Sequence, residues 1–475
     1  MLRLTWVQPE DLLGHELRQA AQDGREPAAV AARWRAAAGP DAPDRAGASP
    51  QPVSRYLRLL AEDLLDELAE LPSSLAEAEP TGLPAIRALC PHWPVRAGGT
   101  GACAGDAGSR ADGTAPSASS PSPAPSPERL EAAWLGRAAG CLLGKPVEKL
   151  PLDGIRELAR ATGNWPLTTW FTARGVPEDL AARHPWNRRS AATSLAENID
   201  GMPQDDDLDY PLLNLLLLRR HGRGFTTADV ARLWLEELPA GRAFTAERVA
   251  YRNLLLGIEP PRTARHRNPF REWIGALIRA DVHGWTNAGD PGAAAAQAHR
   301  DAVLTHTANG VYAAMFAAAV IAAAAGGGQD VHACLATGLT VVPPGSRLAR
   351  AVRHAVRLAG EHEDFDTVVD ALHTAHAGCH WVHAVPNTAL IAAALTHAGG
   401  DFTGSVCRVV AGGWDTDSNG ATAGSVAALL AGSPAALPDR WTAPLKNRLA
   451  TTVADFDGIG FDALAHLTHQ EAARP

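Results

Sequence analysis

Two acidic clusters constrain this chain most, because each lies where an apolar helix is expected to begin. In the better-defined cluster, residues 412–420, Asp415 and Asp417 alternate with hydroxyl-bearing residues between glycines. Two carboxylates spaced by two residues diverge on a helix, but in a turn they can converge on one cation. The glycines permit the backbone angles that such a turn needs. The small and apolar run that follows, to Leu430, predicts a buried helix that packs closely against its neighbours.

Three interpretations of this stretch compete. It matches the first half of an EF-hand calcium loop, but that loop also needs a bidentate glutamate at its twelfth position, where this chain has Val426. The aspartates could instead form an Asx-rich turn that caps the following helix. The third interpretation is half of a metal site, which requires further carboxylates elsewhere in the chain.

The second cluster supplies such carboxylates. Asp205, Asp206 and Asp207 come shortly before the apolar run 212–218. Three adjacent carboxylates at the start of a buried helix repel one another and lose solvation. The helix N-terminus offsets about 1 kcal/mol of this cost, and a divalent cation offsets far more. An acidic first turn without a metal is the simpler alternative, but the presence of two such clusters favours a metal site.

A third acidic position is Glu148, which follows a helix predicted over residues 131–143. The candidate ligands are all oxygen atoms, which suits Mg²⁺ or Mn²⁺ and disfavours zinc or copper. Their number exceeds the need of one ion, so a pair of ions is expected. Paired ions orient a polar substrate and stabilise developing charge, while a nearby carboxylate acts as general acid or base. His380 and His383 have zinc-like spacing, but no further pair completes a tetrahedral set. The residues thus predict metal-assisted hydrolysis of an unspecified bond.

Composition narrows the class of protein. The 475 residues include 43 basic and 52 acidic ones, and this balance argues against a nucleic acid or an acidic membrane as partner. Six widely spaced cysteines without a Cys-x-x-Cys pair are typical of reduced thiols in a cytoplasmic protein. The longest apolar run, residues 311–325, is shorter than a membrane span and is expected inside a helical core. Helical spacing without an alternating strand pattern predicts an all-α fold.

The chain divides into three parts by composition. Residues 1–96 form a helical region of unknown role, with amphipathic helices predicted over 10–23 and 54–70. Residues 97–127 are mostly Gly, Ala, Ser and Pro, and we expect a disordered linker because such a segment has almost nothing to bury. Residues 128–470 contain all the acidic motifs and are predicted to form the catalytic domain.

Four segments carry a resemblance to a known family: residues 140–148, 205–207, 306–312 and 412–424. Their order is similar to that in the ADP-ribosylglycohydrolase family, and the resemblance extends over about residues 128–435. It implies an all-α fold with a binuclear Mg²⁺ centre, in which Mn²⁺ is possible. It also implies cleavage of the bond at C1″ of an ADP-ribosyl group. The expected partner is an ADP-ribosylated protein or a small ADP-ribosyl or ribosyl compound.

The resemblance also assigns roles by position. The implied metal ligands are Asp205, Asp206, Asp207, Asp415, Asp417 and Ser418. The implied catalytic residues are Glu148, Asp206 and Asp415. The implied substrate-binding residues are His306, Asn309, Gly413 and Trp414.

The chain departs from the family pattern in two ways. Asp205 stands where the family usually has Thr, which adds negative charge. Sliding the cluster by one residue would place Gln204 there, but Asp205 is preferred because Leu208 and Tyr210 then fall at the following helix positions. The region before residue 97 and the linker lie outside the core pattern. The substrate therefore stays open between an ADP-ribosylated one and another N- or O-riboside. A non-catalytic ADP-ribose-binding protein is the alternative, although such a relative would be expected to lose these carboxylates.

Overall fold

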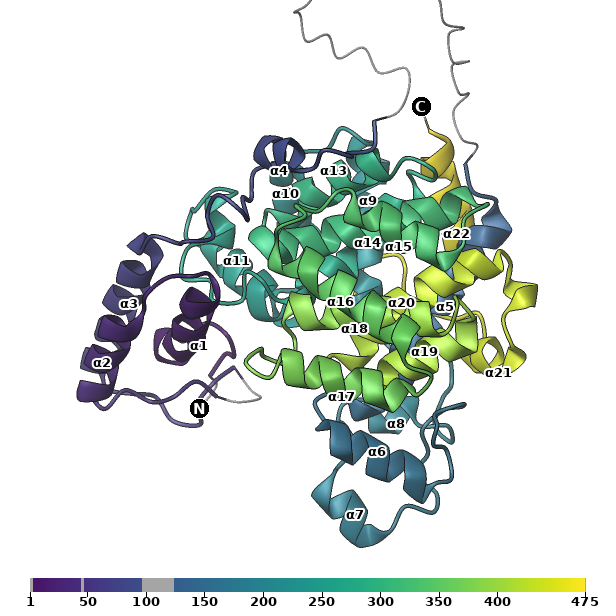
Figure 1. Ribbon diagram of the computed structural model, residues 1–475, viewed down its shortest axis with the longest axis horizontal. Coiled ribbons are helices and arrows are strands. Elements are labelled where there is room, and N and C mark those ends of the chain that lie inside the picture. The colour runs from purple at the N-terminus through teal and green to yellow at the C-terminus, as the bar shows by residue number, and fades with distance from the viewer. Residues whose placement is uncertain (1–2, 44–46, 96–123, 475) are drawn as a thin grey trace, which may run out of the picture.

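The computed structural model describes residues 3–43, 47–95 and 124–474 of the chain. These residues form 22 α-helices with short 3-10 turns and no strand, apart from isolated bridges (Figure 1). The prediction of an all-α fold is therefore confirmed. Most of the predicted linker, residues 97–123, lies outside the described residues.

The centre of the molecule is an antiparallel pair of helices, α5 (Pro127–Gly144) and α20 (Thr416–Ala431). Glycines four residues apart let the two backbones touch, because a Cβ atom added to Gly140 would lie 1.9 Å from the carbonyl oxygen of Gly420. At the end of α5, the Thr416 hydroxyl donates a hydrogen bond to the Gly144 carbonyl over 2.8 Å. This packing brings the segment after α5 beside the N-terminus of α20.

Three further helices enclose this pair: α14 (Ala308–Gly326), α18 (Ala384–His397) and α19 (Phe402–Ala411). Among the described residues, α14 is the one helix long and apolar enough to cross a membrane, and 94% of its most apolar 18-residue window is buried inside the protein. The helix has 19 residues and is therefore longer than the apolar run 311–325 seen in the sequence. Length alone does not exclude a membrane span, so that part of the prediction was wrong. Its burial supports the predicted place in the helical core.

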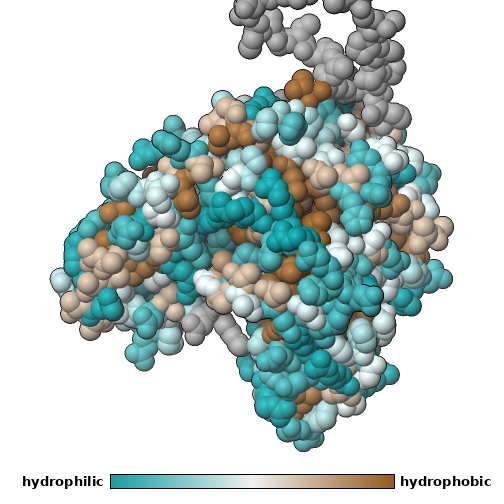
Figure 2. All heavy atoms as spheres, in the orientation of Figure 1, coloured by the Kyte–Doolittle hydropathy of each residue, from teal (hydrophilic) through white to brown (hydrophobic). Residues whose placement is uncertain are grey.

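The N-terminal region, residues 3–43 and 47–95, packs against the rest of the chain through α1 (Pro9–Gln22) and α4 (Leu83–Leu89), and its other helices are α2 (Ala28–Ala36) and α3 (Arg55–Glu70) (Figure 1). Its apolar residues belong to the same core as those of the larger domain. Figure 2 shows a notch between this region and the lobe that carries α6 to α8.

The remaining helices surround these elements. They are α6 (Leu152–Ala161), α7 (Glu178–Arg183), α8 (Ala191–Ser194), α9 (Asp206–His221), α10 (Thr227–Glu237), α11 (Thr245–Leu255), α12 (Asp281–Trp285), α13 (Pro291–Ala302), α15 (Val331–Leu339), α16 (Arg347–Glu361), α17 (Phe365–Ala375), α21 (Asp439–Thr442) and α22 (Phe461–Ala473). Of these, α9 begins at the second acidic cluster, and α11 and α8 each contribute lining residues to the cavity described next.

Candidate active site

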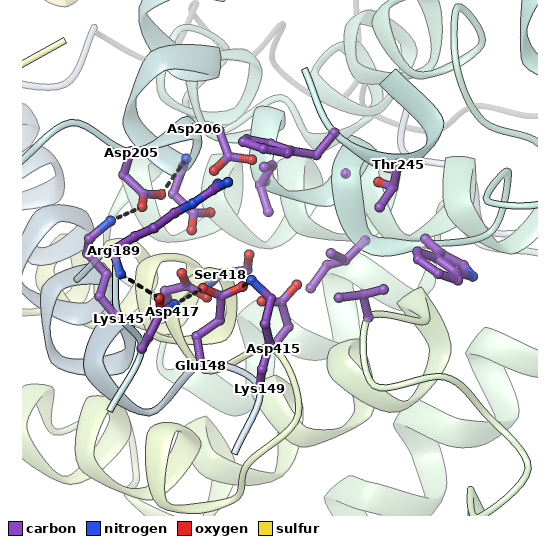
Figure 3. Close-up of a pocket in the computed structure, with 18 of the residues that line it drawn as sticks. Lys145, Glu148, Lys149, Arg189, Asp205, Asp206, Thr245, Asp415, Asp417 and Ser418 are labelled. Atoms are coloured by element: carbon purple, nitrogen blue, oxygen red, sulfur yellow. Dashed lines mark hydrogen bonds and ion pairs between the residues drawn. The ribbon is translucent and has the colours of Figure 1, made fainter. Parts of the chain in front are cut away.

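One cavity of about 450 Å³ collects the acidic residues singled out in the sequence. Its size falls in the range of small-molecule sites in proteins. The predicted metal ligands and the loop glutamate all line it: Glu148, Asp205, Asp206, Asp207, Asp415, Asp417 and Ser418. Segments more than 200 residues apart in the chain thus share one site. In Figure 3, Asp205 and Asp206 face Glu148, Asp415 and Asp417 across this space.

The first carboxylate group consists of Glu148, Asp415 and Asp417, whose nearest oxygen atoms all lie within 4.8 Å of one another. The packing of α5 on α20 causes this, because it sets the residue after α5 against the start of α20. The Asn387 side chain accepts a hydrogen bond of 3.2 Å from the Asp415 backbone N–H and fixes that turn. The Asp415 side chain makes no capping bond, and the chain is already helical from Thr416. Neither the capping interpretation nor an EF-hand loop therefore describes this stretch.

The second group lies at the start of α9. Asp205 occupies the N-cap position and accepts a 2.9 Å hydrogen bond from the Asp207 backbone N–H. Asp207 is buried and lies 3.4 Å from the guanidinium of Arg137. Oxygen atoms of both aspartates lie within 4.8 Å of each other and of the Cys141 sulfur. Burial raises the pKa of the Cys141 thiol well above its ordinary value, and a soft sulfur is a poor ligand for a hard cation such as Mg²⁺.

Lys145 explains how the chain accommodates an aspartate at position 205. Its ammonium forms a buried ion pair with the Asp205 carboxylate. Burial is the largest influence and alone would raise the pKa of Asp205, but the Lys145 charge and the hydrogen bonds from Lys145 and the Asp207 backbone together hold that pKa below its ordinary value. The negative charge added at the position where the family usually has Thr is therefore balanced inside the protein.

Asp206, Asp415 and Asp417 have no ion pair of this kind within the described residues. Burial, followed by the charges of Asp205 and Asp417, raises the pKa of Asp206 well above its ordinary value. Burial and the neighbouring charges of Asp417 and Glu148 do the same to Asp415. Burial, with Glu148 and Asp205 beside it, raises the pKa of Asp417 to about 7. A divalent cation among these oxygens would offset both the burial cost and the repulsion by favouring the ionised carboxylates, so the donor set fits hard cations of the Mg²⁺ type.

Glu148 differs from the buried aspartates because it lies at the edge of the group and its side chain is 17% exposed. The Asn187 amide donates a 2.6 Å hydrogen bond to its Oε2 atom, and the Lys149 ammonium lies 2.7 Å from its Oε1 atom. Both partners orient the carboxylate toward the cavity that all three residues line. Such a group can exchange a proton with a small molecule bound beside it.

The segment around residue 306 takes a different place from that expected. His306 and Asn309 are fully buried and are not among the residues that line the cavity. The His306 Nδ1 atom is hydrogen-bonded to the Thr305 hydroxyl over 2.6 Å. The same atom lies 3.8 Å from the Oε1 atom of Glu247, which does line the cavity. The Asn309 amide donates to Glu272 over 3.0 Å. In this arrangement neither side chain reaches the cavity in which a substrate would bind.

Gly413 and Trp414, also predicted to bind substrate, form the turn that leads into Asp415. Both have positive φ angles, +79° and +57° respectively. The Trp414 indole stacks on the His373 imidazole with ring centroids 4.1 Å apart. Neither residue is among those that line the cavity. In this arrangement they shape the backbone beside the carboxylates rather than forming a wall of the cavity.

Sequence reasoning missed several lining residues. Lys145 lies in segment 140–148, three residues before Glu148, and a lysine so close to a predicted site carboxylate was a signal that could have been used. The rings that line the cavity gave no such signal, because they come from separate segments: Trp6, His15, Phe244, Trp273, His380 and Trp381. Two of them belong to the N-terminal region, for which the sequence offered no role.

Comparison with known proteins agrees with the resemblance seen in the sequence. Residues 122–473 match the model of the family described as ADP-ribosylglycohydrolase. A solved structure described as an ADP-ribosylglycohydrolase-related protein complex is similar at 21% identity and a TM-score of 0.45. The similarity covers 73% of this chain and 98% of that one. No curated protein matches the chain.

Proposed function

Because the chain belongs to the ADP-ribosylglycohydrolase family, we propose that it is a Mg²⁺-dependent hydrolase that cleaves the C1″ glycosidic bond of ADP-ribosylated substrates and releases ADP-ribose. One observation carries this proposal most directly. Two groups of crowded carboxylates, most of them buried, face one cavity, and the pKa values of Asp206 and Asp415 are raised mainly by burial and by their like-charged neighbours.

The residues that would hold two Mg²⁺ ions, or Mn²⁺ in their place, are Asp205, Asp206, Asp207, Asp415, Asp417 and Ser418. Divalent ions at these oxygens would orient the ribose hydroxyls and stabilise the charge that develops during cleavage. The Asp205 carboxylate shares its charge with Lys145, which makes it a weaker ligand than its neighbours. Asp206 and Asp415 are the strongest candidates, because burial and like-charged neighbours outweigh the nearby lysines in raising the pKa of each carboxyl.

Glu148 is the proposed general base. Its carboxylate, held by Asn187 and Lys149, would accept a proton from the water molecule that attacks C1″. The water oxygen would bond to C1″ as the bond from C1″ to the acceptor atom breaks, and the acceptor would leave with the proton that the carboxylate took from water. Arg189 and Arg242 also line the cavity, and neither forms an ion pair within the described part of the chain. Two such guanidinium groups suit the anionic diphosphate of an ADP-ribosyl group.

The test is a panel of ADP-ribosyl-arginine, ADP-ribosyl-serine, O-acetyl-ADP-ribose and simple nucleosides, assayed with and without EDTA. The proposal expects metal-dependent release of ADP-ribose from at least one ADP-ribosyl compound. Asp415→Ala and Asp206→Ala should abolish that release. Asp179→Ala is the matched control, because the Asp179 side chain is 75% exposed on α7, outside the cavity.

The outcomes separate the proposal from its alternatives. Full activity in either cavity variant, or activity that persists in EDTA, contradicts it. Turnover of simple nucleosides alone favours a hydrolase of another riboside at the same centre. Tight binding of ADP-ribose in calorimetry with Mg²⁺, without turnover of any compound, favours a non-catalytic binding protein.

A further inference from the structure

The cavity has a second end, built from rings rather than carboxylates. In Figure 3, Thr245 lies across the cavity from Asp205 and Glu148, and its chain neighbour Phe244 is one of six ring residues that line the space. Trp6 packs edge-on against Phe244, with ring centroids 5.8 Å apart. This wall therefore combines a residue of the N-terminal region with a residue of the larger domain.

A second set of rings adjoins the same wall. The His380 imidazole stacks on Trp273 with centroids 4.2 Å apart and planes 10° from parallel. His15, from α1, packs edge-on against both, at 5.6 Å from Trp273 and 5.8 Å from His380. Flat rings in stacked and edge-on arrangements form apolar surfaces that accept another flat ring. The N-terminal region thus contributes to both sets of rings.

His15 supplies the polar atom in this wall. Its side chain is 95% buried, since 5% of its surface is exposed, and its Nδ1 atom has no hydrogen-bond partner among the described residues. A buried polar atom without a partner is costly in a native structure, and because His15 lines the cavity, a ligand there could supply that partner after a small shift of the ring. Burial, and then the nearby charge of Arg18, lowers the pKa of His15 to about 4, so this imidazole is neutral near pH 7. A neutral imidazole suits a hydrogen bond with the uncharged polar edge of a ligand rather than contact with an anion.

The N-terminal region is fixed where it meets the cavity. Arg271 and Glu272, directly before Trp273, anchor α1. The Arg271 guanidinium binds both carboxylate oxygens of Glu16, over 2.6 and 2.9 Å, and the Gln19 amide donates to Glu272 over 2.8 Å. All four of these side chains are buried. An anchor of this kind holds His15 in one position against Trp273.

Trp6 is held in a similar way. Its backbone has a φ of +59°, an angle that tryptophan rarely adopts, and its N–H donates a 2.6 Å hydrogen bond to the Gly47 carbonyl. A Cβ atom on Gly47 would lie 2.3 Å from the indole ring, so a glycine is needed there. This backbone places the Trp6 ring against Phe244 and under the Arg248 guanidinium, 5.4 Å from the ring centroid.

We propose that the N-terminal region completes the catalytic cavity, with Trp6 and His15 as specificity-determining residues. Together with Phe244, Trp273 and His380 they form a subsite for a planar, uncharged ring, such as the base of a nucleotide. The family match begins at residue 122, so this wall is an addition particular to chains with such an N-terminal region. The inference rests on the proposed function, since it names the part of the substrate that the metal-binding end does not hold.

The experiment measures binding of two probes to the full-length protein in Mg²⁺ by calorimetry. ADP-ribose carries the ring, and ribose 5-phosphate lacks it. Trp6→Ala should weaken ADP-ribose binding by about 10-fold or more, the usual loss when one stacking partner is removed. His15→Phe, which keeps a ring but removes Nδ1, should weaken it by about 5-fold. Neither change should alter ribose 5-phosphate binding.

Controls separate a subsite from a merely structural wall. Trp6→Leu keeps apolar packing without the flat ring, so it should also weaken ADP-ribose binding if Trp6→Ala proves unstable. Trp93→Ala and His92→Gln change the same residue types in the N-terminal region outside the cavity, and both should bind like the natural protein. The inference is wrong if Trp6→Leu and His15→Phe bind ADP-ribose normally, or if both probes lose affinity equally.

Hydrolysis measured on the same preparations distinguishes the two proposals. If the natural protein hydrolyses an ADP-ribosyl compound and the variants show a raised KM with kcat retained, both stand. If it binds ADP-ribose but hydrolyses nothing, the proposed function fails, and the binding losses still support the ring subsite. If it hydrolyses normally and the variants do as well, the ring subsite fails alone. Absence of ADP-ribose binding by the natural protein overturns both.

Discussion

The carboxylates at one end of the cavity come from three short motifs at helix ends, whereas the rings at the other end come from five separate segments of the chain. The acidic end gathers buried like charges that repel one another and weaken the fold unless a cation is bound. The ring end buries apolar surface and is anchored by ion pairs, so it stabilises the fold even without a ligand. The two ends of one cavity thus act oppositely on stability. The acidic end destabilises the metal-free fold, and the ring end stabilises it.

The largest expected effect is a loss of hydrolysis when one carboxylate of the acidic end is neutralised. Asp206→Asn keeps the shape of the side chain but removes a negative charge from the cluster. Hydrolysis should fall by about 10³-fold, because an electrostatic contribution to the transition state is lost. The metal-free variant should nevertheless melt no lower than the natural protein, since the change relieves repulsion from Asp205 and Asp417. Kinetics with Mg²⁺ and thermal melting in EDTA measure the two outcomes. A variant that is both inactive and less stable in EDTA would show that the carboxylates hold the fold instead.

The second effect concerns stability at the ring end. Arg271→Met removes the partner of Glu16 and Asp23, whose side chains are 5% and 14% exposed. Asp23 keeps Arg25 and Arg347 at 3.8 Å, but the buried Glu16 loses its ion-pair partner. Leaving this buried carboxylate unpaired should lower the free energy of unfolding by about 3–5 kcal/mol. Urea unfolding measures this loss, and the KM for an ADP-ribosylated substrate should rise with it because α1 carries His15.

Arg267→Met is the matched control for this change. It also removes an arginine that binds the N-terminal region, but its partners Glu62 and Asp66 are 32% and 53% exposed. Water screens such pairs, so the loss should be about 1 kcal/mol or less. Equal losses in the two variants would contradict the view that the buried anchor holds the ring end in place.

The third effect tests how the acidic end is assembled. Gly140→Ala places a methyl group against the Gly420 carbonyl in the tightest part of the α5–α20 pair. Forcing the helices apart should cost about 1–3 kcal/mol and shift Glu148 away from Asp415, so both stability and hydrolysis should fall. Gly224→Ala is the control, because nothing lies within 4 Å of the added methyl group. Urea unfolding and hydrolysis rates together check this expectation.

The contrast between the two ends also explains what the sequence could predict. The acidic end could be predicted because its aspartates stand in two short motifs, each at the start of an apolar helix: Asp205, Asp206 and Asp207, and Asp415 and Asp417. Their alternation and crowding have a chemical meaning before any fold is known. The all-α fold was accessible for a similar reason, since the helical spacing of apolar residues is a local property.

The ring end of the cavity could not be predicted from the sequence in this way. The role of His15 depends on Trp273 and His380, which lie more than 250 residues away in the chain. No local pattern distinguishes it from any other histidine on a helix. His306 shows the converse case, because the family resemblance implied a substrate contact, whereas tertiary packing buries this side chain completely in the structure. Whether a polar residue faces a cavity or the core is decided by partners that are distant in sequence.

The smallest expected effect is a pH dependence of opposite sign at the two ends. The pKa of Asp417 is raised to about 7 by burial and by Glu148 and Asp205, so the folded protein keeps a proton that the unfolded chain releases near its ordinary pKa. Its contribution to stability is present below the unfolded pKa and is lost as the pH rises through about 7. The pKa of His15 is lowered to about 4, chiefly by burial, so its contribution is instead lost as the pH falls from about 6.5 toward 4.

Each contribution should appear as a difference between the natural protein and one variant, measured by urea unfolding without metal. Asp417→Asn should gain stability relative to the natural protein between about pH 5 and pH 7, and His15→Gln should do so between about pH 6 and pH 4. Either slope should approach about 1.4 kcal/mol per pH unit, the value for one proton. Because a cation must displace the Asp417 proton, Mg²⁺ should also bind up to about tenfold more weakly for each pH unit below 7. Slopes of the same sign in both variants would mean that burial does not act oppositely on the two ends of the cavity.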